Sequence, residues 1–368
     1  MASSIFRPLL NCRRHLPGLL NNAVNLNISL NQKQSLIRYS STYKAALLHE
    51  YGQNLILEDM TRNILKSNEV RVAVHSCGVN ASDRLMVENL YDHPVKRPFV
   101  PGFEVCGEVL EVGSDVKTVV TGTRVIGLNK VALGGFAEEC VLDENDVFMV
   151  DHAVCFDAGA ALADCYSTAL LALNRRAQIK EGDTVLITAA AGGLGLAAVD
   201  LASSVYRAKV IGVCGTEGKA DLVRQKGAWA ALKYNEKHVL QKVKEVTDGK
   251  GVDVVFDAVG GDVFNTALDC VAHEGKVVVA GFASRVVPHI ETSRLLPKAI
   301  SIMGLSLTRY HESDFAVYRQ AVEDVIELHE MKLINPHICA RFKLDETDKA
   351  FDFIKERRSM GKVVLEMD

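Results

Sequence analysis

The sequence has nine cysteines, but no two of them are spaced as Cys-x-x-Cys, and the nine are scattered along all 368 residues. A zinc knuckle or an extracellular disulfide framework needs cysteines at close, recurring spacings. The odd number and wide spacing therefore predict neither, and most of these cysteines are expected to be small buried hydrophobic residues. Internal repeats and low-complexity tracts are also absent, and the length suggests two domains.

Acidic residues are missing from the first 49 positions, which hold six Lys or Arg and many Ser and Asn. No apolar run there is long enough to span a membrane. This composition is typical of a mitochondrial transit peptide, and the step Arg38-Tyr39-Ser40-Ser41 looks like a processing site. We therefore expect residues 1–39 to be removed and the protein to lie in the mitochondrial matrix. A merely disordered N-terminus is the alternative.

Removal of residues 1–39 would take away five positive charges, which changes the formal charge from −4 to −9. Such an acidic protein does not present a general surface for nucleic acids, so nucleic-acid binding is not expected.

The most informative segment that is present runs from Thr188 to Gly195. The apolar run 185–187 before it predicts a buried strand, and a helical pattern follows to about residue 205. Small residues between a strand and a helix let the backbone approach a pyrophosphate, which the helix N-terminus favours electrostatically. The match is Ala190-x-Gly192-x-x-Gly195, so alanine replaces the first glycine of the usual fingerprint. A tight strand–helix turn without a ligand is the alternative.

The following 120 residues favour the dinucleotide interpretation, because short apolar strands alternate with helices. Strands are predicted at 210–213, 230–234, 252–257, 277–280 and 300–305, with helices at 217–225 and up to residue 247. This rhythm is typical of a doubly wound parallel α/β sheet, whose ligand lies at the carboxyl ends of the strands. Further strands, at 69–74, 107–112, 123–126, 138–141, 337–342 and 362–366, predict a second domain built from both ends of the mature chain.

Several short motifs follow one another in a fixed order: Gly78-Val-Asn80-Ala-Ser-Asp83, Pro101-Gly-Phe-Glu104, Glu111-Val-Gly113, Gly122-Thr-Arg-Val-Ile-Gly127, Gly134-Gly-Phe-Ala-Glu138, the glycine-rich turn, Asp257-Ala-Val-Gly-Gly261 and Gly361-Lys-Val-Val364. With them the chain resembles the quinone oxidoreductase branch of the medium-chain dehydrogenase/reductase superfamily, over about residues 43–368. The resemblance implies a GroES-like, partly open β-barrel catalytic domain interrupted by a Rossmann nucleotide-binding domain, with the substrate cleft between them, and a homodimer. It divides the chain into catalytic segments 43–165 and 337–368, a Rossmann NADP-binding domain 166–310 and a helical return segment 311–336.

The same resemblance predicts that no metal is bound. Zinc-dependent relatives hold their catalytic zinc through a Cys at the position of Asn80, a His at the position of Phe103 and a third ligand near Asp164. Asn is a poor zinc ligand and Phe is none, whereas a catalytic zinc needs about three protein ligands. Hydride addition to an activated acceptor, such as a quinone or a conjugated enone, needs less help from a Lewis acid than chemistry on simple alcohols.

The catalytic candidates come from the family positions. Asn80 and Asp83 match polar residues beside the nicotinamide, although a turn cap and a helix N-cap would explain them equally well. Tyr91 matches a tyrosine that quinone reductases share with 2-enoyl thioester reductases, and its hydroxyl could stabilise or protonate an enolate. A half-exposed loop tyrosine is the alternative. A second family tyrosine is Leu85 here, so the site has fewer donors than in the better-known branch.

The choice of cofactor can be argued from charge. Enzymes that use NAD place an acidic residue about 20 residues past the fingerprint, at the end of the second strand. That place is Cys214-Gly215-Thr216 here, where Thr216 and the nearby Lys219 suit a 2′-phosphate, unless Glu217 serves as the acid. We therefore expect NADPH rather than NADH.

Other cofactor contacts are implied by the family. Tyr234 and Arg357 match residues that reach the 2′-phosphate, Thr168 matches a threonine beside the nicotinamide, and Gly260, Gly281 and Phe282 lie at the nicotinamide end. Turn geometry alone would also explain the glycines. The pyrophosphate turn comprises Ala190, Gly192, Gly193, Leu194 and Gly195.

Three functions are consistent with these residues. The leading one is a zinc-independent, NADPH-dependent reductase of quinones or α,β-unsaturated carbonyls. The second is a mitochondrial 2-enoyl thioester reductase, which would need a long apolar acyl channel. The third is a catalytically weak NADPH-binding protein that acts through partner or RNA contacts; the loss at Leu85 favours it, whereas Tyr91, Asn80 and Thr168 oppose it.

Overall fold

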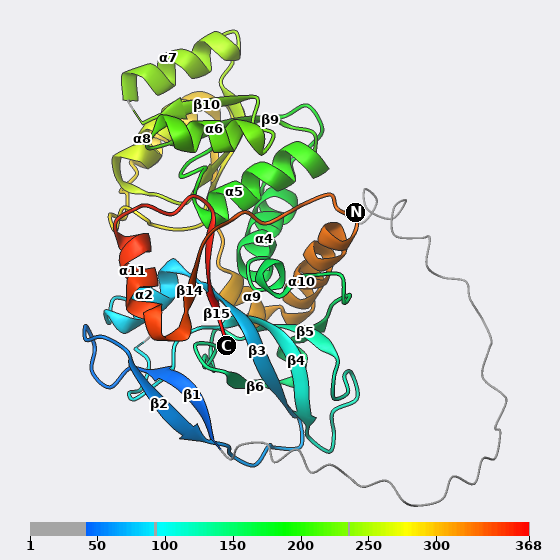
Figure 1. The fold of residues 1–368 in the computed structure, drawn as a ribbon. Helices are drawn as coiled ribbons and strands as arrows, with labels where there is room; N and C mark the ends of the chain where they lie inside the picture. The colour runs from blue at the N-terminus through cyan, green and yellow to red at the C-terminus, as the bar shows by residue number, and fades with distance from the viewer. Residues whose placement is uncertain (1–41, 92–93, 235, 368) are drawn as a thin grey trace, which may run out of the picture. The chain divides into compact units, whose positions relative to one another are not determined.

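The structure, a computed structural model, describes residues 42–91, 94–234 and 236–367. The predicted transit peptide, residues 1–39, lies outside these described residues. Figure 1 shows the ribbon coloured along the chain.

A six-stranded sheet in the middle of the chain has the order β10-β9-β8-β11-β12-β13. Its strands are β8 (Thr184–Ile187), β9 (Lys209–Cys214), β10 (Ala230–Lys233), β11 (Val252–Asp257), β12 (Val271–Val279) and β13 (Ser301–Gly304). Every neighbouring pair is parallel. Numbered along the chain the order is 3-2-1-4-5-6, so the sheet is doubly wound and reverses direction between β8 and β11. The predicted Rossmann sheet is confirmed.

Helices cover this sheet because each strand is apolar and must be buried on both faces. They are α5 (Gly193–Asp200), continued by the π-helix η4 (Leu201–Val205), then α6 (Glu217–Gln225), α7 (Glu236–Val246) and α8 (Gly261–Asp269). On one face, Leu186, Ile211 and Val255 of the sheet pack with Val243 of α7 and Phe264 of α8 in a single buried cluster.

A second sheet of seven strands has the order β14-β15-β3-β4-β5-β7, with β6 paired to β3. Its strands are β3 (Glu69–Val79), β4 (Glu104–Val112), β5 (Arg124–Leu128), β6 (Glu139–Asp143), β7 (Val147–Met149), β14 (Ile338–Lys343) and β15 (Lys362–Glu366). All pairs are antiparallel except β14 with β15. The C-terminal strand β15 therefore lies inside a sheet that the N-terminal half begins, which bears out the predicted fold class.

An antiparallel pair, β1 (Thr42–Leu47) and β2 (Ile56–Thr61), precedes this sheet and was not predicted. The reason is visible in β2, where Ile56 and Leu57 are both exposed, so apolar and polar residues do not alternate with burial.

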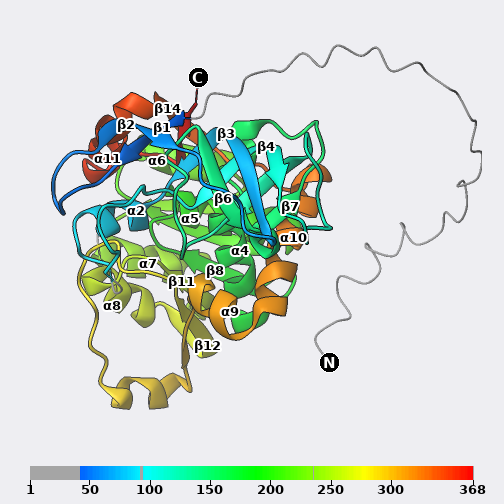
Figure 2. The ribbon, with the colours of Figure 1, turned by 90° about the horizontal axis from the view of Figure 1, so that it is seen from below.

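The remaining helices lie in the connections, some between strands of one sheet and others between the two sheets. They are α2 (Ala81–Val87), η2 (Glu144–Asp146), α3 (Phe156–Gly159), α4 (Ala163–Leu170), the π-helix η3 (Leu171–Ala177), η5 (Thr292–Lys298), α9 (Leu307–Ser313), α10 (Phe315–Glu330), η6 (Leu344–Glu346) and α11 (Thr347–Lys355). All eight residues of α4 are buried, and α4 contacts both α5 and α10. In Figures 1 and 2, α9 and α10 lie on the opposite side from α2 and α11. None of the helices in the described part of the chain combines the length and apolarity needed to cross a bilayer.

Candidate functional site

The glycine-rich turn follows β8, as predicted, and leads directly into α5. Gly192 is the N-cap of α5, and Gly193 and Leu194 begin its first turn, where backbone N–H groups have no intrahelical partner. A Cβ on Gly195 would lie 2.2 Å from the carbonyl oxygen of Ala189, so only glycine fits there. Ala190 is fully buried and donates its N–H to Val213 O at 3.0 Å, which ties the turn to β9. The arrangement can hold an anion at the helix N-terminus.

A buried network connects this turn to the end of β11. The Asp257 carboxylate accepts hydrogen bonds from the Thr188 hydroxyl at 2.6 Å and from the Gly260 N–H at 2.9 Å. Burial raises the pKa of Asp257, and these hydrogen bonds oppose the shift. Gly260 has φ +73°, and a Cβ there would lie 2.6 Å from Val286 O, so the turn itself requires glycine. The carboxyl ends of β8 and β11 are thereby held together.

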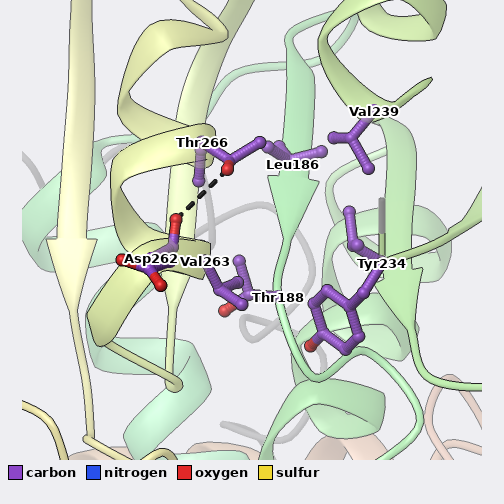
Figure 3. A pocket seen from close by; sticks show the side chains of 9 residues that line it. Leu186, Thr188, Tyr234, Val239, Asp262, Val263 and Thr266 are labelled. Atoms are coloured by element: carbon purple, nitrogen blue, oxygen red, sulfur yellow. Dashed lines mark hydrogen bonds between the residues drawn. The ribbon is translucent and has the colours of Figure 1, made fainter. Parts of the chain in front are cut away.

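A cavity of about 210 Å³ opens beside this network, between the sheet and the helices α7 and α8 (Figure 3). Its wall is mostly apolar and is formed by Leu186, Thr188, Val213, Tyr234, Val239, Asp262, Val263, Thr266 and Ala267. The Tyr234 hydroxyl accepts a hydrogen bond from the Ala189 N–H at 2.7 Å, so its ring spans from the cavity to the glycine-rich turn. Burial raises the pKa of Tyr234 to about 12, so the phenol remains protonated.

Two cationic side chains lie next to the end of β9. Lys219 Nζ donates to the carbonyl oxygen of Arg357 at 2.6 Å. Burial lowers the pKa of Lys219, and the Arg357 charge adds to that shift. Thr216 is the N-cap of α6, where its hydroxyl accepts from the Lys219 N–H at 3.4 Å. Glu217 is paired with Arg224 at 3.1 Å and also lies 3.7 Å from Lys233.

A second cluster joins three strands of the other sheet. Lys362 Nζ contacts Asn80 Oδ1 at 2.6 Å and Glu104 Oε2 at 2.5 Å, and Asn80 Nδ2 donates to the same Glu104 oxygen at 3.0 Å. Burial by itself lowers the pKa of Lys362, but the anionic groups around it raise the pKa overall. Cys165 lies 3.8 Å from this ammonium, and burial raises its pKa to about 12, so its thiol is neutral.

Lys362 and Glu104 were not singled out from the sequence, although both belong to motifs that carried the resemblance. The signal was their position in Gly361-Lys-Val-Val364 and Pro101-Gly-Phe-Glu104.

Another buried ammonium, that of Lys130, forms an ion pair with Asp164 and lies 4.9 Å from the centre of the Phe103 ring. Asn80, Phe103 and Asp164, the positions that correspond to zinc ligands in relatives, therefore contact two lysine side chains. Within the described ranges, no group of three or more His, Cys, Asp or Glu side chains could hold a metal ion.

The other predicted catalytic residues lie close to these clusters. Asp83 is fully buried at the third position of α2 and accepts the Asn80 N–H at 2.8 Å and the Gly102 N–H at 3.2 Å. It is thus not the N-cap, which is Asn80. Tyr91 is half-buried just beyond α2, and Thr168 is buried in α4, one turn after Asp164.

At the end of β12, Gly281 and Phe282 come next to Gly260. A Cβ on Gly260 would lie 3.0 Å from the Phe282 ring, whereas one on Gly281 would make only an ordinary contact with Ala258. Phe282 itself is exposed.

The glycine-rich turn and the lysine cluster meet at two consecutive residues. The Gly361 N–H donates to Ala191 O at 2.8 Å, and Gly361 forms a parallel bridge with Gly192. The next residue, Lys362, makes the contacts described above. Gly361 has φ +102°, and a Cβ there would lie 2.3 Å from His337 O, so no other residue fits. This link places a dinucleotide turn beside Asn80.

A doubly wound sheet inserted into a mainly antiparallel one, with its dinucleotide turn against the latter, defines the two-domain nicotinamide-dependent dehydrogenases. Residues 66–152 match the alcohol dehydrogenase GroES-like domain family, and residues 193–327 match the zinc-binding dehydrogenase family. The chain belongs to the medium-chain dehydrogenase/reductase superfamily, in its quinone oxidoreductase-like branch.

Individual relatives are similar over most of their length. The chain is 43% identical to the quinone oxidoreductase-like protein 2 homolog of Nematostella vectensis, over 88% of this chain and 89% of that protein. It is 41% identical to quinone oxidoreductase-like protein 2 of Mus musculus, over 88% and 92%. The crystal structure of Escherichia coli quinone oxidoreductase complexed with NADPH superposes with a TM-score of 0.79 at 28% identity, over 88% and 99%. The chain is therefore an oxidoreductase of a family that uses a nicotinamide cofactor.

Proposed function

We propose that the protein is an NADPH-dependent reductase of quinones or α,β-unsaturated carbonyls that works without zinc. The observation that carries the proposal is the pairing at the end of β9, where Lys219 lies against Arg357 while Glu217 is engaged by Arg224. The Glu217 carboxylate contacts Arg224 and Lys233, and these contacts disfavour its use for a ribose 2′-hydroxyl. The two cations instead suit a 2′-phosphate.

The rest of the cofactor fits the described residues. The N–H groups that begin α5 would hold the pyrophosphate. The cavity of about 210 Å³ beside Tyr234 is apolar and would take the flat adenine ring. The link between Gly361 and Ala191 would bring the nicotinamide towards Asn80 and Thr168. When bound, NADPH supplies the hydride.

At the acceptor end, this chain would orient the carbonyl and provide a proton. Asn80 has a fixed orientation, because its Nδ2 donates to Glu104 and its Oδ1 accepts from Lys362. Tyr91 is half-buried, so its hydroxyl could reach both the acceptor oxygen and water. A conjugated acceptor needs no metal to polarise it, and the lysine contacts of Asn80 and Asp164 support metal-independence.

A substrate panel tests the proposal. Purified protein with NADPH should reduce 1,2-naphthoquinone or an enal, without stoichiometric metal by elemental analysis and without loss of activity on chelation. NADPH binding without turnover of any acceptor would instead support a catalytically weak binding protein. A strong preference for long acyl thioesters would support the 2-enoyl thioester reductase. One zinc per chain, lost together with activity, would contradict metal-independence.

We also propose that residues 1–39 direct the protein to the mitochondrial matrix and are removed there, and that the mature enzyme is a homodimer. The support for the first part is the composition of the first 49 residues, and the homodimer is what the family resemblance implies. N-terminal sequencing of the protein from its source tissue tests the first part, and an intact start at Met1 or Ala2 in the cytosol would refute it. Sedimentation of the mature protein tests the second, and a monomer would refute it.

A further inference from the structure

We propose that the ammonium group of Lys130 binds the acceptor's carbonyl oxygen and takes up the negative charge that develops there, with Asp164 as its positioning residue. The inference rests on the proposed function and identifies a further residue of the same site.

The surroundings of Lys130 are those of a held but incompletely satisfied cation. Its side chain is 17% exposed, and Asp164 is the carboxylate that contacts it among the described residues. The Phe103 ring covers another side of the ammonium, 4.9 Å from its centre. An ammonium has three N–H donors, and a ring face cannot satisfy them as an oxygen can. The side chain is partly exposed, so its remaining N–H donors are open to water in the free enzyme and to the oxygen atom of a ligand in the complex.

The position of Lys130 is on the acceptor side of the site. Asp164 precedes Thr168 by one helical turn on α4, so both lie on the same side of that helix. The backbone N–H of Asp164 donates to Glu104 Oε1 at 2.9 Å, and Glu104 in turn binds Asn80. Lys130 therefore belongs to the same connected group of side chains as the predicted catalytic Asn80.

The protonation of Lys130 follows from the groups that face it. Burial is the largest single influence and lowers the pKa of Lys130, but Asp164, Tyr91 and Cys165 together raise the pKa overall. The amine therefore stays charged at neutral pH. Asp164 supplies the opposite charge that a buried ammonium needs.

The charge on the acceptor follows from electron counting. The acceptor's electrophilic carbon gains one hydrogen and two electrons as hydride, and a new C–H bond forms. The π electrons of the conjugated system move to the carbonyl oxygen, which becomes an enolate or a hydroquinone monoanion. A proton from Tyr91 or from water then completes the neutral product. A cation beside that oxygen stabilises the charge before the proton arrives.

Variants of Lys130 test the proposal through turnover of an enone with NADPH. Lys130→Met should lower kcat by about 10- to 100-fold, the range for a lost oxyanion donor that is partly exposed. Lys130→Arg keeps the positive charge and should retain most of the wild-type kcat. Lys117→Met, which removes an exposed lysine of the loop between β4 and β5, is the matched control and should change nothing. The double variant Lys130→Met/Asp164→Asn avoids a buried unpaired carboxylate and should be as slow as Lys130→Met.

A binding measurement separates a catalytic role of Lys130 from a structural one, because the loss of a purely structural lysine would not change the preference for a bound anion. The probe is 4-nitrophenol, whose phenolate is coloured, bound to the protein saturated with NADP⁺. The wild-type complex should prefer the phenolate over the phenol by at least about tenfold more than Lys130→Met does. Asp164→Asn should make kcat fall at a lower alkaline pH than in the wild type, because the amine then loses its proton more readily.

The two proposals fail in different ways. The role of Lys130 would be overturned if Lys130→Met kept full kcat, even if quinones are reduced. It would also be overturned if the wild-type complex did not prefer the phenolate or did not bind 4-nitrophenol at all. Absence of turnover with the phenolate preference intact would overturn the proposed reductase function alone.

Discussion

Glu217 and Lys219 lie two positions apart at the start of α6, yet their side chains have different partners. Glu217 pairs with Arg224, about two turns further along the same side of the helix, whereas Lys219 reaches the Arg357 carbonyl near the C-terminus. From the sequence alone, either residue could have bound the adenosine ribose. The contacts of the folded chain favour Lys219 over Glu217 for the proposed 2′-phosphate.

At this residue scale we expect the mature protein to bind NADPH more tightly than NADH. A charged hydrogen bond between Lys219 and the 2′-phosphate is worth about 1.5–3 kcal/mol, roughly 10- to 150-fold in affinity. Lys219→Ala should remove most of that preference and leave NADH binding nearly unchanged, as measured by fluorescence titration. Lys209→Ala is the matched control, because Lys209 begins β9 and Lys219 lies just beyond the other end of that strand. Equal wild-type affinities for the two cofactors would contradict the expectation.

A related expectation concerns Tyr91. Tyr91→Phe removes only the hydroxyl, so the melting temperature and NADPH affinity should hold while kcat for an enone falls by about 10-fold. This is the lower end for an oxyanion donor, because Tyr91 is half-buried and water can replace it. Tyr43→Phe, at another half-buried tyrosine, provides the control. If Tyr91→Phe keeps full turnover, the tyrosine is structural and Asn80 becomes the main candidate for holding the carbonyl.

At the scale of elements, the start of α2 shows that structural contacts can account for polar residues in a family motif. Its N-cap is Asn80, and the Asp83 carboxylate folds back to accept the Asn80 N–H and also holds Gly102. These contacts explain an aspartate here without reference to a substrate. They also fix the start of α2, and with it the position of Asn80, against β4.

Asp83 should make stability depend on pH. Burial raises its pKa from 3.8 to about 7. Between those values the native state holds a proton that the unfolded state has lost, so the Asp83 contribution to the free energy of unfolding decreases as pH rises. The total change is at most about 4 kcal/mol, and it levels off above the native pKa.

Urea unfolding from pH 4 to 8 checks this. Relative to wild type, Asp83→Asn should become more stable as pH rises through that window, because an amide has no proton to lose. Asp115→Asn, at an exposed position, should follow the wild-type curve. Parallel curves for Asp83→Asn and wild type would show that Asp83 is ionised in the native state throughout.

At the scale of the whole molecule, the C-terminal strand β15 holds the two sheets together through consecutive residues. Gly361 contacts the glycine-rich turn, and Lys362 contacts Glu104 and Asn80. The tail therefore completes the core of one sheet and also links the glycine-rich turn to the cluster of Lys362, Glu104 and Asn80.

Removal of the Lys362 ammonium should lower the free energy of unfolding. Lys362→Met leaves Glu104 buried and unpaired, and we expect a loss of about 3–5 kcal/mol in the free energy of unfolding. Lys362→Met/Glu104→Gln replaces the charge by an amide that can pair with Asn80, so it should be more stable than the single variant. Denaturant unfolding of both variants and wild type measures this. A double variant less stable than Lys362→Met would refute the explanation.

Much of this protein was determined by the sequence itself. The strands β8, β9, β10, β11 and β13 were predicted to within a few residues, because parallel strands are short apolar runs and the helices between them are amphipathic. The glycine-rich turn could also be predicted from the sequence. Gly195 has no room for a Cβ, so the tight turn requires a glycine at that position. The pair β1 and β2 could not be predicted in this way, because residue type in β2 does not follow burial: Ile56 and Leu57 are exposed, whereas Glu58 is half-buried.

Only the tertiary structure decided how the site is assembled. Lys362 and Asn80 are 282 positions apart, and Lys362 and Glu104 are 258 apart, so no spacing in the sequence records that they meet. The same holds for Lys130 with Asp164, and for Lys219 with Arg357, which is 138 positions away. Charge pairs form where folding brings side chains out of water together, and that depends on the whole chain rather than on any segment of it.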